Sequence, residues 1–95
     1  MTTFDETHSL VVAEAEAEGP NAVAELRLLE DRYRLACDLI GRRRALHMTQ
    51  EQLAAASGIR QSEISRIEGG SGNPTLKTIG ALARALGTEL RLSAS

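Results

Sequence analysis

The stretch TQEQLAAASGIRQSEISRIEGG, residues 49–70, decides the fold that we predict for this chain. It holds two short helical patterns separated by Gly58 and followed by the glycine pair at 69–70. Thr49 is a suitable N-cap, and Gln52 is placed to complete a capping box with it. A glycine adopts the left-handed backbone of a helix end at little cost, so we expect Gly58 to end the first helix.

The spacing of small and apolar residues in this stretch predicts two helices that cross at a wide angle. Counted from Gln50 as position one, alanine is fifth, glycine is ninth, and the fourth, tenth, fifteenth and eighteenth residues are apolar. These six residues are Leu53, Ala54, Gly58, Ile59, Ile64 and Ile67. No proline or charge occupies a slot that must be buried. This is the helix-turn-helix pattern, whose second helix enters a DNA major groove.

Polar residues on the second helix are the candidates for contact with DNA bases. They are Arg60, Gln61, Ser62, Ser65 and Arg66. Arginine suits guanine, glutamine suits adenine, and serine suits either. Thr49, Gln50 and Asn73 are placed where donors would reach backbone phosphates.

A long helical pattern precedes the motif. Apolar residues at steps of three and four predict one helix over residues 21–46. Its first turns would expose an apolar stripe that includes Leu26, Leu29 and Tyr33, and such a stripe favours contact with another surface. The alternative is a break near residues 30–31, with the first piece folding back on its own domain.

The chain after the motif predicts one more helix and a short strand. Pro74 is suited to open a helix over TLKTIGALARALG, residues 75–87, which Gly87 would end. In TELRLSAS, residues 88–95, Leu90 and Leu92 alternate with charged residues, as in a strand. A single strand needs a pairing partner, which a second copy or another protein would supply. The alternative is a frayed extended tail.

Composition indicates one small all-α domain with added segments. Of the 95 residues, 42% are hydrophobic but only 2% are aromatic, which suits small, closely packed helices. We expect a flexible or weakly helical acidic arm over residues 1–20, a helical extension over 21–37, the helix-turn-helix domain over 38–87, and a strand or tail over 88–95.

The net charge of −2 conceals an uneven distribution. Residues 1–37 carry eight acidic and three basic side chains, whereas residues 38–95 carry five acidic and eight basic ones. An acidic arm before a mildly basic body is typical of a chain with two kinds of partner. The alternative is an acidic tail that serves only solubility.

Several functional classes are not expected. Cys37 is the sole cysteine, so no internal disulfide forms, and with His8 and His47 it is too sparse for a metal site. We expect no cofactor, no signal peptide and no membrane span, and therefore a cytoplasmic protein. The chain shows neither a catalytic triad nor a phosphate-binding loop, so we do not expect an enzyme.

Residues 38–86 resemble the Cro/C1-type (XRE-family) helix-turn-helix domain. The resemblance lies in TQEQLA, GIRQSEISRIEGG and NPTLKTIGALARALG. It implies a lambda-repressor-like bundle of about five helices. It also implies that Gln50 contacts phosphate and braces Gln61, and that Arg43 and Glu68 form a structural ion pair.

The short chain, the helical extension and the ending LKTIGALARALGTELRLS are similar to HigA-like antitoxins. The resemblance implies a homodimer that binds its own operator and neutralises a RelE/HigB-like ribonuclease toxin. Leu26, Leu29 and Tyr33 are the toxin-contact candidates, and Leu90 and Leu92 the dimer-strand candidates. Two alternatives are a free-standing XRE-type repressor without a toxin and a protein-interaction module that has lost DNA binding.

Overall fold

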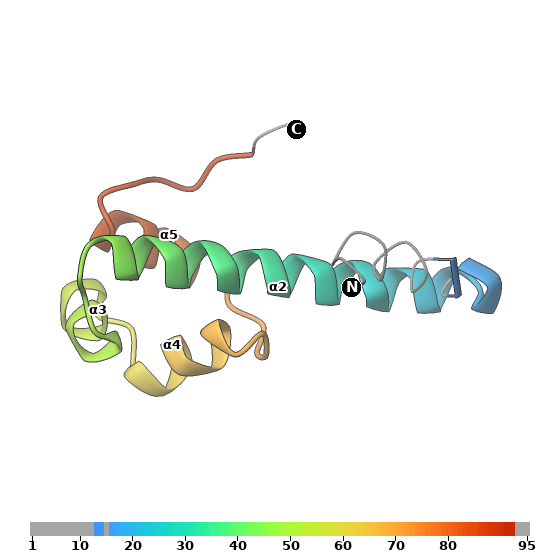
Figure 1. The fold of residues 1–95 in the computed structure, drawn as a ribbon, viewed down its shortest axis with the longest axis horizontal. Coiled ribbons are helices and arrows are strands. Elements are labelled where there is room, and N and C mark those ends of the chain that lie inside the picture. The colour runs from blue at the N-terminus through green and yellow to red at the C-terminus, as the bar shows by residue number, and fades with distance from the viewer. Residues whose placement is uncertain (1–12, 15, 93–95) are drawn as a thin grey trace, which may run out of the picture. The chain divides into compact units, whose positions relative to one another are not determined.

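The computed structural model describes residues 13–14 and 16–92, and the part of the chain it describes is helical (Figure 1). The helices are α2 (Pro20–Ala45), α3 (Gln50–Ser57), α4 (Gln61–Glu68) and α5 (Leu76–Ala85), and residues 13–14 and 16–18 are also helical. The predicted all-α class is confirmed. None of the helices in the described ranges is long and apolar enough to cross a membrane. Predictions for residues 1–12, 15 and 93–95 lie outside the described residues.

The chain divides into two compact units, Met1–Asp31 and Arg32–Ser95. The second unit contains the predicted helix-turn-helix domain. The boundary falls within α2, close to the place where the alternative interpretation puts a break. α2 is nevertheless one helix, and its ends differ by one residue from those predicted.

Local signals at both ends of α3 act as the sequence predicts. The Thr49 hydroxyl accepts a hydrogen bond from the Gln52 N–H (3.0 Å), and the Gln52 side chain accepts one from the Thr49 N–H (2.8 Å). At the other end, Gly58 has φ 76°, and its N–H donates to the Ala54 carbonyl (2.9 Å). A side chain at this left-handed position would cost roughly 1 kcal/mol. The turn between α3 and α4 therefore depends on this glycine.

One apolar core holds the second unit together. Its buried members are Leu39 of α2, Leu53 of α3, Ile64 and Ile67 of α4, Leu82 of α5, and Leu86, which directly follows α5. Leu53 and Ile64 are fully buried. α3 and α4 have eight residues each, and helices this short are not stable alone in water. Their stability comes from this shared core.

A polar contact also joins α2 to the end of α5. The Arg42 Nε donates a hydrogen bond to the Leu86 carbonyl at 3.0 Å. That carbonyl lies just beyond the last residue of α5, where helix carbonyls lack an internal partner. Arg42 thus satisfies the end of one helix from the surface of another.

The predicted C-terminal strand is not formed in the single chain. Residues 88–92 have no regular secondary structure, and the described part of the chain contains no strand. The Thr88 N–H still bonds to the Ala83 carbonyl (2.9 Å), and beyond it the segment leaves α5. A two-residue alternation places side chains on two faces, but a strand also needs a neighbouring backbone to bond with.

We expect Leu53→Ala to lower the free energy of unfolding by about 2–5 kcal/mol, because the site is fully buried and a cavity would remain. Leu76→Ala is the matched control, since the Leu76 side chain is 72% exposed, and it should cost less than about 1 kcal/mol. Urea unfolding followed by circular dichroism measures both. Equal stabilities of the two variants would contradict this core.

Candidate nucleic-acid interface

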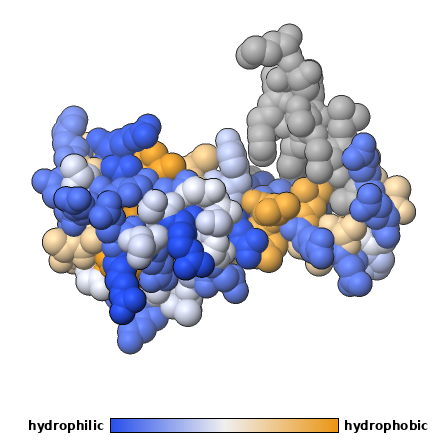
Figure 2. All heavy atoms as spheres, turned by 90° about the horizontal axis from the view of Figure 1, so that it is seen from below, coloured by the Kyte–Doolittle hydropathy of each residue, from blue (hydrophilic) through white to orange (hydrophobic). Residues whose placement is uncertain are grey.

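The outward face of α4 carries the five base-contact candidates, Arg60, Gln61, Ser62, Ser65 and Arg66. All five are exposed, while Ile64 and Ile67 on the other face are buried. Arg60 is the N-cap, with extended backbone and no side-chain capping bond. The side of the domain that carries α4 is mainly hydrophilic (Figure 2). Because Ile64 and Ile67 are buried, the polar side chains on the opposite face of α4 are exposed to solvent.

A polar cleft joins the start of α4 to the loop before α5. It has a volume of about 230 Å³, and its lining includes Arg60, Ser62, Arg66 and Asn73. The structure therefore brings one phosphate-contact candidate, Asn73, beside three of the base-contact candidates. Gln61 and Ser65, which are also on α4, do not line this cleft, and neither do Thr49 and Gln50 at the start of α3.

Hydrogen bonds hold the loop after α4 against the end of that helix. The Ser71 N–H and the Ser71 hydroxyl both donate to the Arg66 carbonyl, at 2.9 and 3.0 Å. Gly70 and Gly72 have φ 77° and 82°, which lets the chain turn back tightly. This turn places Asn73 at the polar cleft.

Arg43 of α2 and Glu68 at the end of α4 form a bidentate ion pair. Arg43 Nε lies 2.7 Å from Glu68 Oε2, and Arg43 Nη2 lies 2.8 Å from Glu68 Oε1. The side chains are only 12% and 6% exposed, respectively. Arg43 Nη1 also donates to the Met48 carbonyl (2.8 Å). The pair thus ties α2 and the chain before α3 to the last residue of α4.

The surroundings of Glu68 favour its ionised form. Burial acts to raise the pKa of its carboxyl, but hydrogen bonds from Arg43 and Gln50, and the positive charges of Arg43 and Arg44, outweigh it. The pKa of Glu68 is therefore below its ordinary value. The hydrogen bond with Glu68 raises the pKa of Arg43, so both partners keep their charges.

Gln50 belongs to the same network, which the sequence did not indicate. Its Nε2 donates to Glu68 Oε1 at 3.1 Å, although the two residues are 18 apart in sequence. The resemblance implies that Gln50 braces Gln61, but in the described residues its amide is bonded to Glu68. An amide nitrogen carries two hydrogens, so one remains for a phosphate. No spacing rule gives this contact, because it depends on how α3 and α4 cross.

The toxin-contact candidates lie on α2. Leu26 is half-buried, and Leu29 and Tyr33 are 56% and 51% exposed. Leu28, which the sequence analysis did not single out, is 42% exposed.

Comparison with known proteins places the chain in a family. A family model described as Helix-turn-helix (HTH_3) matches residues 40–92, which include five of the six buried core residues and the polar face of α4. The chain belongs to this helix-turn-helix family of DNA-binding regulators, and its domain is of the XRE type.

Similar proteins share modest sequence identity with the chain. Antitoxin HigA1 of Mycobacterium tuberculosis, from strains CDC 1551 / Oshkosh and ATCC 25618 / H37Rv, is 36% identical over 81 residues. The match covers 85% of this chain and 54% of HigA1, so the chain spans about half the length of these relatives. An uncharacterized HTH-type transcriptional regulator of Haemophilus influenzae is 40% identical over 68 residues, covering 72% of this chain and 69% of that protein. No solved structure matches the chain.

We expect Glu68→Gln to destabilise the domain by about 1–3 kcal/mol at neutral pH, because it leaves the partly buried Arg43 without its counter-charge. The lowered pKa of Glu68 means that its carboxylate contributes stability above the unfolded-state pKa. That contribution is lost as the pH falls through the folded-state pKa. The difference between wild type and variant should therefore shrink in acid.

Urea unfolding at a series of pH values measures this difference. Glu51→Gln is the control, because Glu51 is exposed in the first turn of α3 and its loss should cost less than about 1 kcal/mol. A Glu68→Gln effect that is small, or that does not vary with pH, would contradict a stabilising role for the ion pair.

Proposed function

We propose that this chain is an antitoxin that binds the operator of its own operon as a homodimer and neutralises a RelE/HigB-like ribonuclease toxin. The observation that carries the DNA part is the exposed polar face of α4, fixed by the burial of Ile64 and Ile67. The toxin part is supported by the 36% identity to Antitoxin HigA1. The proposed role is non-enzymatic, and the protein acts in the cytoplasm, where bacterial operators lie.

DNA recognition in this proposal divides between affinity and specificity. Arg60, Gln61 and Ser62, at the leading end of α4, contact base edges, and Ser65 and Arg66 follow one turn on. Thr49, Gln50 and Asn73 donate to phosphates, which fix the position of α4 on the duplex. A dimer would place two α4 helices in half-sites one helical turn apart, roughly 34 Å. Binding should weaken steeply as salt rises, because phosphate contacts release counterions.

Toxin binding in this proposal uses a different part of the chain. Leu29 and Tyr33 are about half exposed, which favours burial against a partner. Residues 1–37 carry an excess of acidic side chains, and these complement a basic RNA-cleaving enzyme. Leu26 adds to the apolar contact.

A free-standing repressor is the second candidate. The relative from Haemophilus influenzae is named as a transcriptional regulator, and the match covers a larger share of it than of HigA1. On this alternative the DNA contacts stay the same and no toxin is bound. The product of the neighbouring gene separates the two candidates.

Arg60→Ala combined with Gln61→Ala should weaken binding to DNA from upstream of the chain's own gene by at least about 30-fold, since each base contact is worth about 1–3 kcal/mol. Arg84→Ala is the control, because it removes an exposed positive charge from α5. Fluorescence anisotropy gives the affinities, and footprinting shows whether an inverted repeat is protected. A protected repeat that the double variant still binds would assign DNA recognition elsewhere; no protected repeat would favour a protein-interaction module.

Leu29→Glu combined with Tyr33→Glu should reduce capture of a small basic protein encoded beside this gene by at least about tenfold, while DNA binding is kept. Leu76→Glu is the control, because it changes an exposed leucine outside α2. Co-expression with a tagged neighbour and calorimetry on the purified pair measure the effect. If the wild-type chain captures no such protein, the free-standing repressor is the better description.

A further inference from the structure

Glu63 differs in chemistry from the other polar residues that line the cleft at the start of α4. It belongs to the first turn of that helix and is half-buried. Among the described residues, it supplies the one carboxylate of the lining. The other polar side chains of the lining can all donate hydrogen bonds, whereas an ionised carboxylate only accepts them. These donors are Arg60, Ser62, Arg66 and Asn73.

The charged side chains of the polar cleft are not paired with one another. Arg60 and Arg66 lie three residues before and after Glu63, and all three line the cleft. Residues three apart on a helix are neighbours on its surface. Within the described part of the chain, however, the Glu63 carboxylate takes part in no hydrogen bond or ion pair. The carboxylate is therefore available to a ligand, as are both guanidinium groups.

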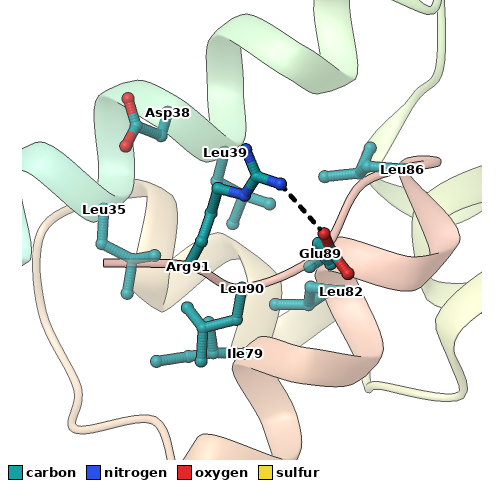
Figure 3. Close-up of a pocket in the computed structure, with 10 residues that line it drawn as sticks. Leu35, Asp38, Leu39, Ile79, Leu82, Leu86, Glu89, Leu90 and Arg91 are labelled. Carbon is teal, nitrogen blue, oxygen red and sulfur yellow. Dashed lines mark hydrogen bonds and ion pairs between the residues drawn. The ribbon is translucent and has the colours of Figure 1, made fainter. Parts of the chain in front are cut away.

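Elsewhere the same kinds of neighbours do form pairs. Arg27 and Glu30 are also three residues apart, and their charged atoms are 3.2 Å from each other. At the rim of the apolar groove between α2, α5 and the segment after α5, Glu89 lies 3.2 Å from Arg91 (Figure 3). Proximity in sequence thus suffices for pairing at these two places, and Glu63 differs from both in keeping its carboxylate unpaired.

An unpaired carboxylate on a DNA-reading helix favours one base over the other three. The phosphates repel it, so it lowers the affinity unless a base offers it a donor. In the major groove guanine and thymine present acceptors, and adenine presents an acceptor beside its N6 amine. Cytosine presents its N4 amine without a neighbouring acceptor. Cytosine is therefore the base that suits a group which only accepts.

We propose that Glu63 is a specificity-determining residue, which accepts a hydrogen bond from the N4 amine of a cytosine in the operator. The inference rests on the DNA binding of the proposed function and names one base that this binding requires. The Cβ atoms of residues three apart on a helix are about 5–6 Å from each other, so Arg66 reaches a neighbouring base edge. Arginine suits guanine, and the two side chains together select G·C pairs.

A structural effect of Glu63 can be separated from this role. A negative charge in the first turn of a helix stabilises that helix, and Glu63 is the acidic residue in the first turn of α4. Such stabilisation changes the affinity for every DNA sequence by the same factor. Base recognition instead changes the ratio of affinities between sequences, and this ratio is what the experiments measure.

Selection of binding sites from a random DNA library by the full chain tests the proposal. One position of the wild-type site should be cytosine, and any other base there should weaken binding about 5- to 150-fold, the range of one good base contact. Glu63→Gln should lose this preference and favour adenine at the same position, because glutamine suits adenine. Glu51→Gln is the matched control, since it removes the same charge from the first turn of α3, outside the cleft, and should keep the preference for cytosine.

A modified base tests the contact without altering the protein. N4-methylcytosine still pairs with guanine, but its methyl group replaces the hydrogen that points into the major groove. At the selected cytosine it should weaken wild-type binding at least about fivefold, and it should have little effect on Glu63→Ala. The same modification at a cytosine outside the selected site is the control. Fluorescence anisotropy measures each affinity.

Three outcomes would overturn the inference. If the wild-type chain selects a defined site and every base preference survives Glu63→Gln, the cytosine contact is refuted and the proposed DNA binding stands. If Glu63→Gln weakens binding to all sequences by one factor, Glu63 acts through the stability of α4, and thermal unfolding should show the loss. If the wild-type chain enriches no sequence, the proposed DNA binding fails and this inference fails with it.

Discussion

The burial of Ile64 and Ile67 against Leu53 is the constraint on which the rest of the structure depends. An eight-residue helix has little stability of its own, so α4 exists because these side chains leave water. The same burial fixes the rotation of the helix about its axis. Arg60, Gln61 and Arg66 are exposed as a direct result. Stability and the presentation of the polar face are therefore two effects of one contact.

The hydrogen-bond network of Arg43, Glu68 and Gln50 fixes the helices around this apolar core more tightly than packing alone. It joins α2, the end of α4 and the beginning of α3 through hydrogen bonds of 2.7–3.1 Å. Charges with side chains so little exposed are tolerated only when they are fully paired. Apolar packing alone would allow α4 to rotate slightly about its axis, whereas the bidentate pair of Arg43 and Glu68 allows little rotation. The network thus restrains α4 and orients a side chain proposed to contact phosphate.

The sequence predicted those features that depend on local chemistry. Thr49, Gln52 and Gly58 fix the ends of α3 through contacts within a few residues, and the spacing of Ile64 and Ile67 gives the buried face of α4. The bond between Gln50 and Glu68 was not predictable, because it joins residues brought together only by the crossing of two helices. The strand pattern at 88–92 failed in the single chain because side-chain alternation carries no information about a backbone partner.

The boundary at Asp31 and Arg32 has an evolutionary consequence. All six buried members of the core lie at or after Leu39, so substitutions before residue 32 do not remove a core side chain. The leading part of the chain is therefore free to diversify while the helix-turn-helix unit stays constant. Conversely, α4 can acquire a new base preference by changes at exposed positions. Gene duplication followed by independent drift of the two halves would yield insulated regulatory circuits from one scaffold.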